Sequence, residues 1–377
     1  MKKKKGRGKD PSPLTLKKLC ANAAGRCQFE GCNKSVFVDS LTLKQFNMSN
    51  VAHIVAADPN GPRGDAVRSH LLSDKLENLM LMCHDHHKLI DDYADEYPED
   101  RLLQMKAQHE QAIADQCALI YKEPSEMVFL QSPIKGRIPV KIDSNQCANA
   151  VMPNKRVANA RGQRIKVEVE DDYHSSSYWV NAARMLDRRY GLLIGGILDE
   201  EANTHFSVFP IAPIPLIIKL GYMMGDKCRA DIFQYTRAKD SWKWSEEGNA
   251  NSFSIKKQVI RDGTQIALVL SLTADIADAR ITDVYDADII YFIQAERLGV
   301  DCIKSPADLI GFWSAYQKVC DEIRNQYPGT REIGIFPAIP VSAAFEVGRR
   351  YMPGVYPLLK IYDDDDGFFE TITIGGK

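Results

Sequence analysis

The sequence lacks the features that would place the chain in a membrane or in an oxidising compartment. No hydrophobic run approaches the roughly 20 residues that span a bilayer, and the basic start Met1-Lys2-Lys3-Lys4-Lys5 is followed by no apolar signal region. The nine cysteines include one close pair and otherwise scattered singles, which favours reduced thiols over a disulfide framework. We therefore expect a soluble cytoplasmic protein with no membrane partner.

A large excess of charge of either sign is also lacking, because the formal net charge is only -2. Residues 1–121 contain 17 Lys or Arg against 16 Asp or Glu, and six of those basic residues lie in the first nine positions. Attraction to nucleic acid would therefore be local to this end of the chain. Residues 1–13 are predicted to be a disordered basic tail, and both a solubilising terminus and a DNA-holding arm fit that composition.

The 377 residues, 45% of them hydrophobic, are enough for two or three domains with their own cores. Periodicity is clear on both sides of a stretch that is interrupted by proline at positions 124, 133, 139 and 153. We predict a first domain over 14–122, a linker over 123–160 and a second domain over 161–377.

The most unusual stretch is Cys83-His84-Asp85-His86-His87, which places five potential metal ligands directly after an apolar run. Upstream, Cys27 and Cys32 are separated by four residues on a glycine-containing turn. Two pairs of this kind, with Cys83 and His86 as the second, have the spacing of a structural zinc site. His87 is then left for a second, catalytic metal.

Two further residues complete a known pattern: His53 in Ala52-His53-Ile54 and Asn78 in Glu77-Asn78-Leu79. The order of a Cys pair, His, Asn and a Cys/His pair followed directly by His resembles the HNH endonucleases with their ββα-metal motif, over residues 15–112. The resemblance implies an α+β domain in which strands near 51–56 and 76–82 precede a helix over 86–93. It also implies that His53 is the general base, that Asn78 has a supporting role, and that His87 binds catalytic Mg²⁺ or Mn²⁺.

The pattern departs from the family at Ala52, where many HNH enzymes have a metal-binding Asp. Asp91, four residues after His87 and so on the same face of a helix, is one candidate for the missing carboxylate. Asp65 in the Gly-Pro-Arg-Gly-Asp loop is another. For each of them a plain capping or turn role is the alternative.

The remainder of the chain contains an internal repeat. Sliding the sequence by 127 residues lays the segment that starts at Phe209-Pro210 on the segment that starts at Phe336-Pro337, and brings Gly221 onto Gly348. Each copy has a β-rich run, a Pro-started helix and a second β-rich run, and each follows a long amphipathic helix. The order predicts two Rossmann-like α/β halves.

Two such halves behind an effector resemble the SAVED domain, over residues 160–377, with CARF-like halves. HNH followed by SAVED resembles the effector nucleases of bacterial CBASS anti-phage immunity. The resemblance implies that a cyclic di- or trinucleotide binds the second domain, drives assembly of several subunits, expected to be a tetramer, and activates cutting of double-stranded DNA.

Ligands of open α/β sheets bind at the carboxyl ends of the strands, beside helix N-termini. This rule selects the segments after Pro210 and Pro337. Phosphate binding and base stacking are predicted for the following residues: Ser342, Arg237, Lys239, Trp242, Trp244, Tyr235 and Tyr362. The alternative for the two tryptophans is that they cover an edge of the core, and the run 363–366 is expected to be a solvated loop.

Two other functions fit the sequence less well. A constitutive restriction-type nuclease, whose second domain reads DNA, would cut without any nucleotide. A zinc-binding module on a nucleotide sensor would hold zinc and cut nothing. The intact set His53, Asn78 and His87 argues against the second alternative.

Overall fold

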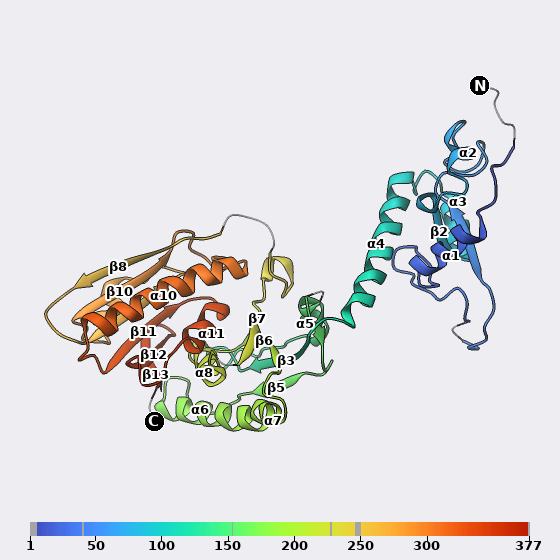
Figure 1. Ribbon diagram of the computed structural model, residues 1–377. Coiled ribbons are helices and arrows are strands. Elements are labelled where there is room, and N and C mark those ends of the chain that lie inside the picture. The colour runs from blue at the N-terminus through green and yellow to red at the C-terminus, as the bar shows by residue number, and fades with distance from the viewer. Residues whose placement is uncertain (1–5, 40, 153, 227, 246–249, 376–377) are drawn as a thin grey trace. The chain divides into compact units, whose positions relative to one another are not determined.

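The chain folds into two compact units, Met1–Tyr121 and Lys122–Lys377 (Figure 1). The computed structural model describes residues 6–39, 41–152, 154–226, 228–245 and 250–375. The division after Tyr121 lies one residue before the end that was predicted for the first domain.

The first unit is built on a two-stranded antiparallel sheet. Its elements are α1 (Pro13–Asn22), β1 (Ser49–His53), α2 (Arg68–Leu72), η1 (Leu76–Asn78), β2 (Leu79–Cys83), α3 (His84–Asp92) and α4 (Glu99–Leu119). Strand β1 pairs with β2 so that His53 lies opposite Leu79 and Ser49 opposite Cys83. Helix α3 begins at the residue after β2, so the predicted order of strand, strand and helix is confirmed.

The strand β2 is apolar throughout because both of its faces are covered. All five of its residues are buried, in one core with Leu19 of α1, Ile90 of α3 and Leu102 of α4. Helix α1 starts at a proline, and the hydroxyl of the preceding Ser12 accepts a hydrogen bond from the Thr15 N–H, which is a favourable N-terminal arrangement.

The predicted disorder of residues 1–13 is wrong for the part of the tail that the structure describes. The N–H of Gly8 donates to the Ala57 carbonyl at 2.8 Å, and the N–H of Ser12 donates to the Asp74 carboxylate at 2.7 Å. Backbone donors with partners of this kind hold a segment against the domain even where its composition is polar. Residues 1–5 lie outside the described part of the chain.

The second unit contains two sheets. The first has the strand order β4-β3-β6-β7, with β5 also paired to β3, and the second has the order β13-β12-β11-β9-β10-β8. The first part of this unit comprises β3 (Pro124–Gln131), α5 (Ser144–Val151), β4 (Arg156–Val157), β5 (Gln163–Lys166), α6 (Ser176–Tyr190), η2 (Gly191–Gly195), α7 (Gly196–Glu200), β6 (His205–Ile211), α8 (Ile214–Met224), β7 (Arg229–Ile232) and η3 (Arg237–Lys239). The second part comprises β8 (Phe253–Val259), β9 (Ile266–Ser271), α9 (Asp278–Thr282), β10 (Ile289–Ala295), α10 (Pro306–Gln326), β11 (Glu332–Ala338), α11 (Val341–Arg349), β12 (Leu358–Asp364) and β13 (Phe368–Ile374).

The internal repeat is confirmed in three dimensions. The parallel strands β3, β6 and β7 of the first sheet correspond to β9, β11 and β12 of the second. The strands β6 and β11, and the first residues of α8 and α11, are related by the predicted shift of 127 positions. Helices α8 and α11 lie side by side (Figure 1). A Cβ added at Gly221 would lie 2.1 Å from the Phe345 carbonyl oxygen, and one added at Gly348 would lie 1.8 Å from that of Ile218.

The predicted linker over 123–160 is wrong, because this stretch contains strands β3 and β4 of the first sheet and helix α5. Strand β3 pairs in parallel with β6 along its length, and Met127 to Gln131 are buried. Its prolines do not interrupt an element: Pro124 is the first residue of the strand and Pro133 follows it. The run Met127-Val128-Phe129-Leu130 is apolar without alternation because, as in other parallel sheets, both faces of the strand are covered.

Candidate functional site

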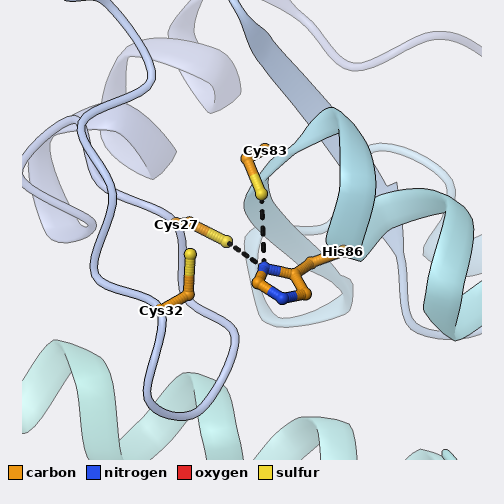
Figure 2. Close-up of side chains that lie close together, drawn as sticks. All are labelled: Cys27, Cys32, Cys83 and His86. Atoms are coloured by element: carbon orange, nitrogen blue, oxygen red, sulfur yellow. Dashed lines mark hydrogen bonds between the residues drawn. The ribbon is translucent and has the colours of Figure 1, made fainter. Parts of the chain in front are cut away.

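Three cysteines and a histidine converge in the first unit (Figure 2). One ligand atom from each of Cys27, Cys32, Cys83 and His86 lies within 4.8 Å of all the others. The Nδ1 atom of His86 is 3.2 Å from the sulfur of Cys83 and 3.7 Å from that of Cys27. The four side chains that were predicted to form the zinc site therefore do lie together in the structure.

The local structure explains why these side chains meet. Gly31, with φ of 74°, allows the tight turn between the first two cysteines. The Gln28 N–H donates to the Leu81 carbonyl and its side chain accepts from the Leu81 N–H, each at 2.8 Å, which fastens this turn to β2. The Phe29 ring stacks on His86 with centroids 4.1 Å apart.

The chemistry of this cluster fits zinc. Three thiols and one imidazole nitrogen are a common tetrahedral ligand set for a closed, structural Zn²⁺ site. Burial raises the pKa of Cys27 to about 12, so the thiolate that a metal requires is costly here without a cation to balance it.

The residues expected to carry catalysis lie on the same two strands and helix. His53 ends β1 and is half-buried, and its Nε2 atom is 3.0 Å from the Ser73 carbonyl oxygen. Because a carbonyl only accepts, this contact assigns the ring proton to Nε2 and leaves Nδ1 as the acceptor. Burial lowers the pKa of His53, and the hydrogen bond to Ser73 opposes that effect.

Asn78 is buried, and its side-chain amide forms hydrogen bonds with backbone groups near His53. Its oxygen accepts from the Val55 N–H at 2.8 Å, and its nitrogen donates to the carbonyls of Val55 at 2.9 Å and Leu72 at 3.3 Å. The residue therefore fixes the segment that follows β1, and these contacts agree with the supporting role that the resemblance implied.

His87 follows the cluster in the first turns of α3 and has its own neighbour. Its Nε2 atom is 3.9 Å from the Asp91 carboxylate one turn later. The other oxygen of Asp91 is 3.1 Å from the guanidinium of Arg63, which is buried and also donates to the carbonyls of Ile54 and Ile90. Arg63 thus joins the end of β1 to α3, a role that sequence reasoning missed although the residue lies in the predicted loop.

The structure distinguishes the two candidates for the missing carboxylate, Asp65 and Asp91, by their contacts. Ala52 is buried and faces Met80 across the hairpin. Asp65 accepts the N–H groups of Val67 and Arg68 at the start of α2, which is a capping role. Asp91 lies one helical turn after His87, with its carboxylate 3.9 Å from the Nε2 atom, so it remains the candidate for the missing carboxylate.

A cavity of about 500 Å³ lies in the second unit where the two repeats meet. It is lined by the residues that follow strands of both sheets and by the first residues of α8 and α11. Several lining residues are paired by the shift of 127: Tyr173 with Val300, Ala212 with Ile339, Pro213 with Pro340, Ile214 with Val341, and Arg237 with Asp364. The cavity therefore lies where the strand-end rule predicted a ligand site.

Two of the seven predicted ligand residues, Tyr235 and Arg237, line this cavity. Ser342 does not line it: it is fully buried, and its hydroxyl donates to the Gln234 amide oxygen at 2.7 Å. Ser342 therefore orients Gln234, which does line the cavity, and its role as a phosphate donor is a wrong prediction.

Two of the four predicted aromatic residues, Trp242 and Tyr362, are core residues and do not line this cavity. Trp242 is buried against Phe209, with centroids 5.2 Å apart. Tyr362 is buried and stacks on Phe336 at 4.4 Å. Trp244 lines a different cavity, of about 740 Å³.

Lys239 is exposed and does not line the 500 Å³ cavity. Its Nζ atom contacts the Ser245 hydroxyl at 3.5 Å. The prediction that Lys239 faces the ligand is therefore not supported by its position.

The acidic run 363–366 is not a solvated loop. Asp365 is buried and pairs with Lys135 at 2.6 Å and with Arg137 at 3.5 Å. Asp363 lines the cavity and accepts the Tyr173 hydroxyl, and burial raises its pKa to about 6. No local pattern in the sequence marked Tyr173 as a lining residue or the aspartates as buried.

Comparison with known proteins identifies part of this unit. Residues 191–374 match SAVED, the SMODS-associated and fused to various effectors sensor domain. This part of the chain is therefore a SAVED domain, as the repeat indicated. No curated protein matches the chain.

The solved structures that match the chain include receptors that contain SAVED/CARF domains. Cap4 of Acinetobacter baumannii with the cyclic trinucleotide 2′3′3′-cAAA matches at 10% identity and a TM-score of 0.45, covering 78% of this chain and 62% of that one. The same receptor with 3′3′3′-cAAA matches at 11% identity with the same TM-score and coverage. Cap4 of Moraxella osloensis matches at 11% identity and a TM-score of 0.39, covering 76% of this chain and 60% of that one. The chain thus spans less than two thirds of the length of these receptors.

Among the described residues, no helix combines the length and the apolar character that a membrane crossing requires.

Proposed function

We propose that this chain is an antiviral effector of the CBASS type, in which a cyclic di- or trinucleotide bound by the SAVED domain activates DNA cutting by an HNH domain in the first unit. The observation that carries the nuclease half is the position of His53, Asn78 and His87 on β1, the end of η1 and α3, beside the cysteine-rich cluster. The sensor half is supported by the SAVED match and by the cavity between the repeats.

Phosphodiester hydrolysis needs a base for the attacking water and stabilisation of the charge that grows on the phosphate. His53 can take the proton at Nδ1, because the Ser73 carbonyl holds the proton of the other ring nitrogen. His87 and Asp91 would hold Mg²⁺ or Mn²⁺, which would neutralise charge on the phosphate. Arg63 would keep Asp91 in place from its other oxygen.

The zinc cluster has a structural task in this proposal. A unit with a two-stranded sheet has a small core, and a structural zinc contributes on the order of 10 kcal/mol of apparent binding free energy. Bound Zn²⁺ would join the turn of Cys27 and Cys32 to the start of α3, and so set the direction in which His87 points.

The sensor cavity supports a ligand with several phosphates and bases. Two helix N-termini face it, at Pro213-Ile214 and Pro340-Val341, and the backbone N–H groups of such termini favour anions. Tyr235 offers a ring and Arg237 a cation from the same wall. We propose that ligand binding assembles several subunits, expected to be a tetramer, on double-stranded DNA.

Plasmid cleavage by the purified protein in Mg²⁺ tests the proposal, first without nucleotide and then with a panel of cyclic di- and trinucleotides that includes 3′3′3′-cAAA. Cutting that requires one member of the panel is the expected result. Cutting without any nucleotide would instead favour a restriction-type enzyme whose second unit reads DNA. Zinc binding without cutting under any condition would favour a non-enzymatic module.

Two variants separate catalysis from folding. His53→Ala removes the base but no core contact, so we expect at least a 100-fold loss of cutting with unchanged zinc content. Cys27→Ala removes a ligand, so zinc and the circular dichroism of the first unit should be lost. All four tryptophans, Trp179, Trp242, Trp244 and Trp313, lie in the second unit, so the fluorescence melting curve of Cys27→Ala should stay close to that of the wild type. An active His53→Ala protein would end the assignment of the base.

A further inference from the structure

The described N-terminal segment, residues 6–12, runs along the edge of the candidate nuclease site and is named here the N-terminal strap. It is held at two points, by the hydrogen bond from the Gly8 N–H to the Ala57 carbonyl and by the one from the Ser12 N–H to Asp74. The Asp74 carbonyl also contacts the Thr15 hydroxyl at 3.5 Å. These contacts give a short polar segment a defined course over the domain.

The strap contacts the same residue that orients His53. A Cβ added at Gly8 would lie 2.7 Å from the Cβ of Ser73, so only glycine lets the strap lie this close. The carbonyl of Ser73 is the partner of His53 Nε2. Arg7, the neighbour of Gly8, is thereby brought to the rim of the site.

The electrostatics agree with this geometry. Arg7 is among the groups that lower the pKa of His53, and Asp10 is among those that raise it, although burial is the largest cause of the shift. Both strap residues are therefore within electrostatic reach of the candidate base.

The ion pair between Arg7 and Asp10 is exposed, so the Arg7 guanidinium can change its partner from Asp10 to a phosphate. It is 3.3 Å from the Asp10 carboxylate, and the two side chains are 63% and 84% exposed. An exposed ion pair of this kind is worth at most about 1 kcal/mol, whereas a guanidinium binds a phosphate through two parallel hydrogen bonds. A DNA backbone that entered the site would compete with Asp10 for the same group.

We propose that Arg7 binds a backbone phosphate of duplex DNA next to the bond cut at His53, and that Asp10 holds the guanidinium until DNA arrives. This inference rests on the proposed nuclease function. The strap would then be part of a DNA-binding surface. Because it would contact phosphates and not bases, its binding to DNA would have no sequence preference.

The test measures binding of the full-length protein to a fluorescein-labelled 20-base-pair duplex by anisotropy, between 50 and 200 mM NaCl. His53→Ala serves as the background so that the duplex stays intact. Loss of one phosphate contact lowers the slope of log K against log salt by about 0.9, which corresponds to roughly tenfold weaker binding at 50 mM. Arg7→Ala should show both effects, and Arg7→Lys should keep the slope.

Two further variants make the result specific. Lys18→Ala removes an exposed cation from α1, and binding should change by less than a factor of two. Asp10→Asn removes the competitor, and binding should become tighter. A purely structural Arg7–Asp10 pair would instead make Arg7→Ala and Asp10→Asn weaken binding alike, and that result would overturn the inference.

The failure of this inference and the failure of the proposed function look different. If the plasmid is cut in the presence of nucleotide but Arg7→Ala has the salt slope of Lys18→Ala, Arg7 is not a DNA ligand and the nuclease proposal stands. If the wild type neither binds nor cuts duplex DNA with any nucleotide of the panel, both proposals fall. Zinc content and circular dichroism of Arg7→Ala should equal those of the background; their loss would assign Arg7 to folding and overturn the inference.

Discussion

The polar residues of the two candidate sites are held by different kinds of contact. Asn78 uses its amide oxygen and nitrogen on the backbone, so it can position the loop after β1 but has little capacity for a substrate. His53 has one ring nitrogen bound to a carbonyl and the other left as an acceptor. Asp363 is different again, because it is an acid in the wall of the sensor cavity with a hydroxyl as its partner.

Asp363→Asn should stabilise the second unit above pH 6. Burial raises the pKa of Asp363 from 3.8 to about 6, so the folded protein retains a proton that the unfolded chain releases between these values. The wild type therefore loses stability as the pH rises from about 4 to 6. Asparagine has no such proton, and its side-chain oxygen can still accept the Tyr173 hydroxyl. The melting temperature of the variant should therefore exceed that of the wild type by roughly 2–5 °C at pH 7.5.

Tryptophan fluorescence at pH 4.0 and pH 7.5 measures this difference in the second unit alone. The advantage of the variant should be small at the lower pH. Asp366→Asn is the matched control, because Asp366 is exposed in the same turn and has φ of 63°, which asparagine tolerates well. An equal shift for both variants would mean that local charge, and not burial of Asp363, is responsible.

At the scale of elements, the crossing of α8 and α11 holds the two repeats together. Gly348→Ala should destabilise this contact, because its Cβ would lie 1.8 Å from the Ile218 carbonyl oxygen and 2.7 Å from the Tyr222 nitrogen. These are backbone atoms, so the helices must move apart, at a cost of about 1–3 kcal/mol or more. We expect the melting temperature measured by tryptophan fluorescence to fall by at least about 2 °C.

Gly196→Ala is the control for helix propensity. Gly196 begins α7, and nothing lies within 4 Å of a Cβ added there. Alanine in this open position should leave the melting temperature unchanged or raise it slightly. If Gly348→Ala left the melting temperature as unchanged as Gly196→Ala does, the conclusion that α8 and α11 approach closely at Gly348 would be wrong.

The elements that the sequence predicted well are those whose signal is local. The Cys and His spacing located the cluster, and the repeat located β6, α8, β11 and α11. The error at Tyr362 shows the limit of the repeat. Tyr235 follows the end of β7, whereas Tyr362 lies inside β12, which continues to Asp364. The longer strand directs this ring to the core, and its length is set by pairing with β13; within the described part of the chain no such strand pairs with β7.

The contact of Ser342 and the pairing of β3 could not be predicted from the sequence, for two further reasons. The position of Ser342 after a strand was predicted, but the partner of its hydroxyl, Gln234, is 108 residues away and belongs to the other repeat. Strand β3 was missed because its prolines suggested a linker, while its pairing with β6 joins segments 80 residues apart. Contacts of this range leave no periodic pattern in the sequence.

At the scale of the whole molecule, the division after Tyr121 has a direct consequence for where the sensor unit can be cut. A fragment that begins at residue 161 lacks β3, which lies between β6 and both β4 and β5 in the first sheet. Its four apolar residues Met127-Val128-Phe129-Leu130 are fully buried, and each contributes about 1.5–3 kcal/mol. The sum of roughly 6–12 kcal/mol is as large as the stability of a typical domain.

We therefore expect residues 122–377 to fold alone and residues 161–377 to fail. The longer fragment should give a cooperative fluorescence melting curve within a few degrees of the full chain, since it retains both sheets and all four tryptophans. The shorter fragment should be insoluble or melt without cooperativity, because the edge of β6 and the core residues around Phe209 become exposed. A cooperative transition of 161–377 at the temperature of the longer fragment would show that the sensor core does not depend on β3, and would restore 123–160 as a linker.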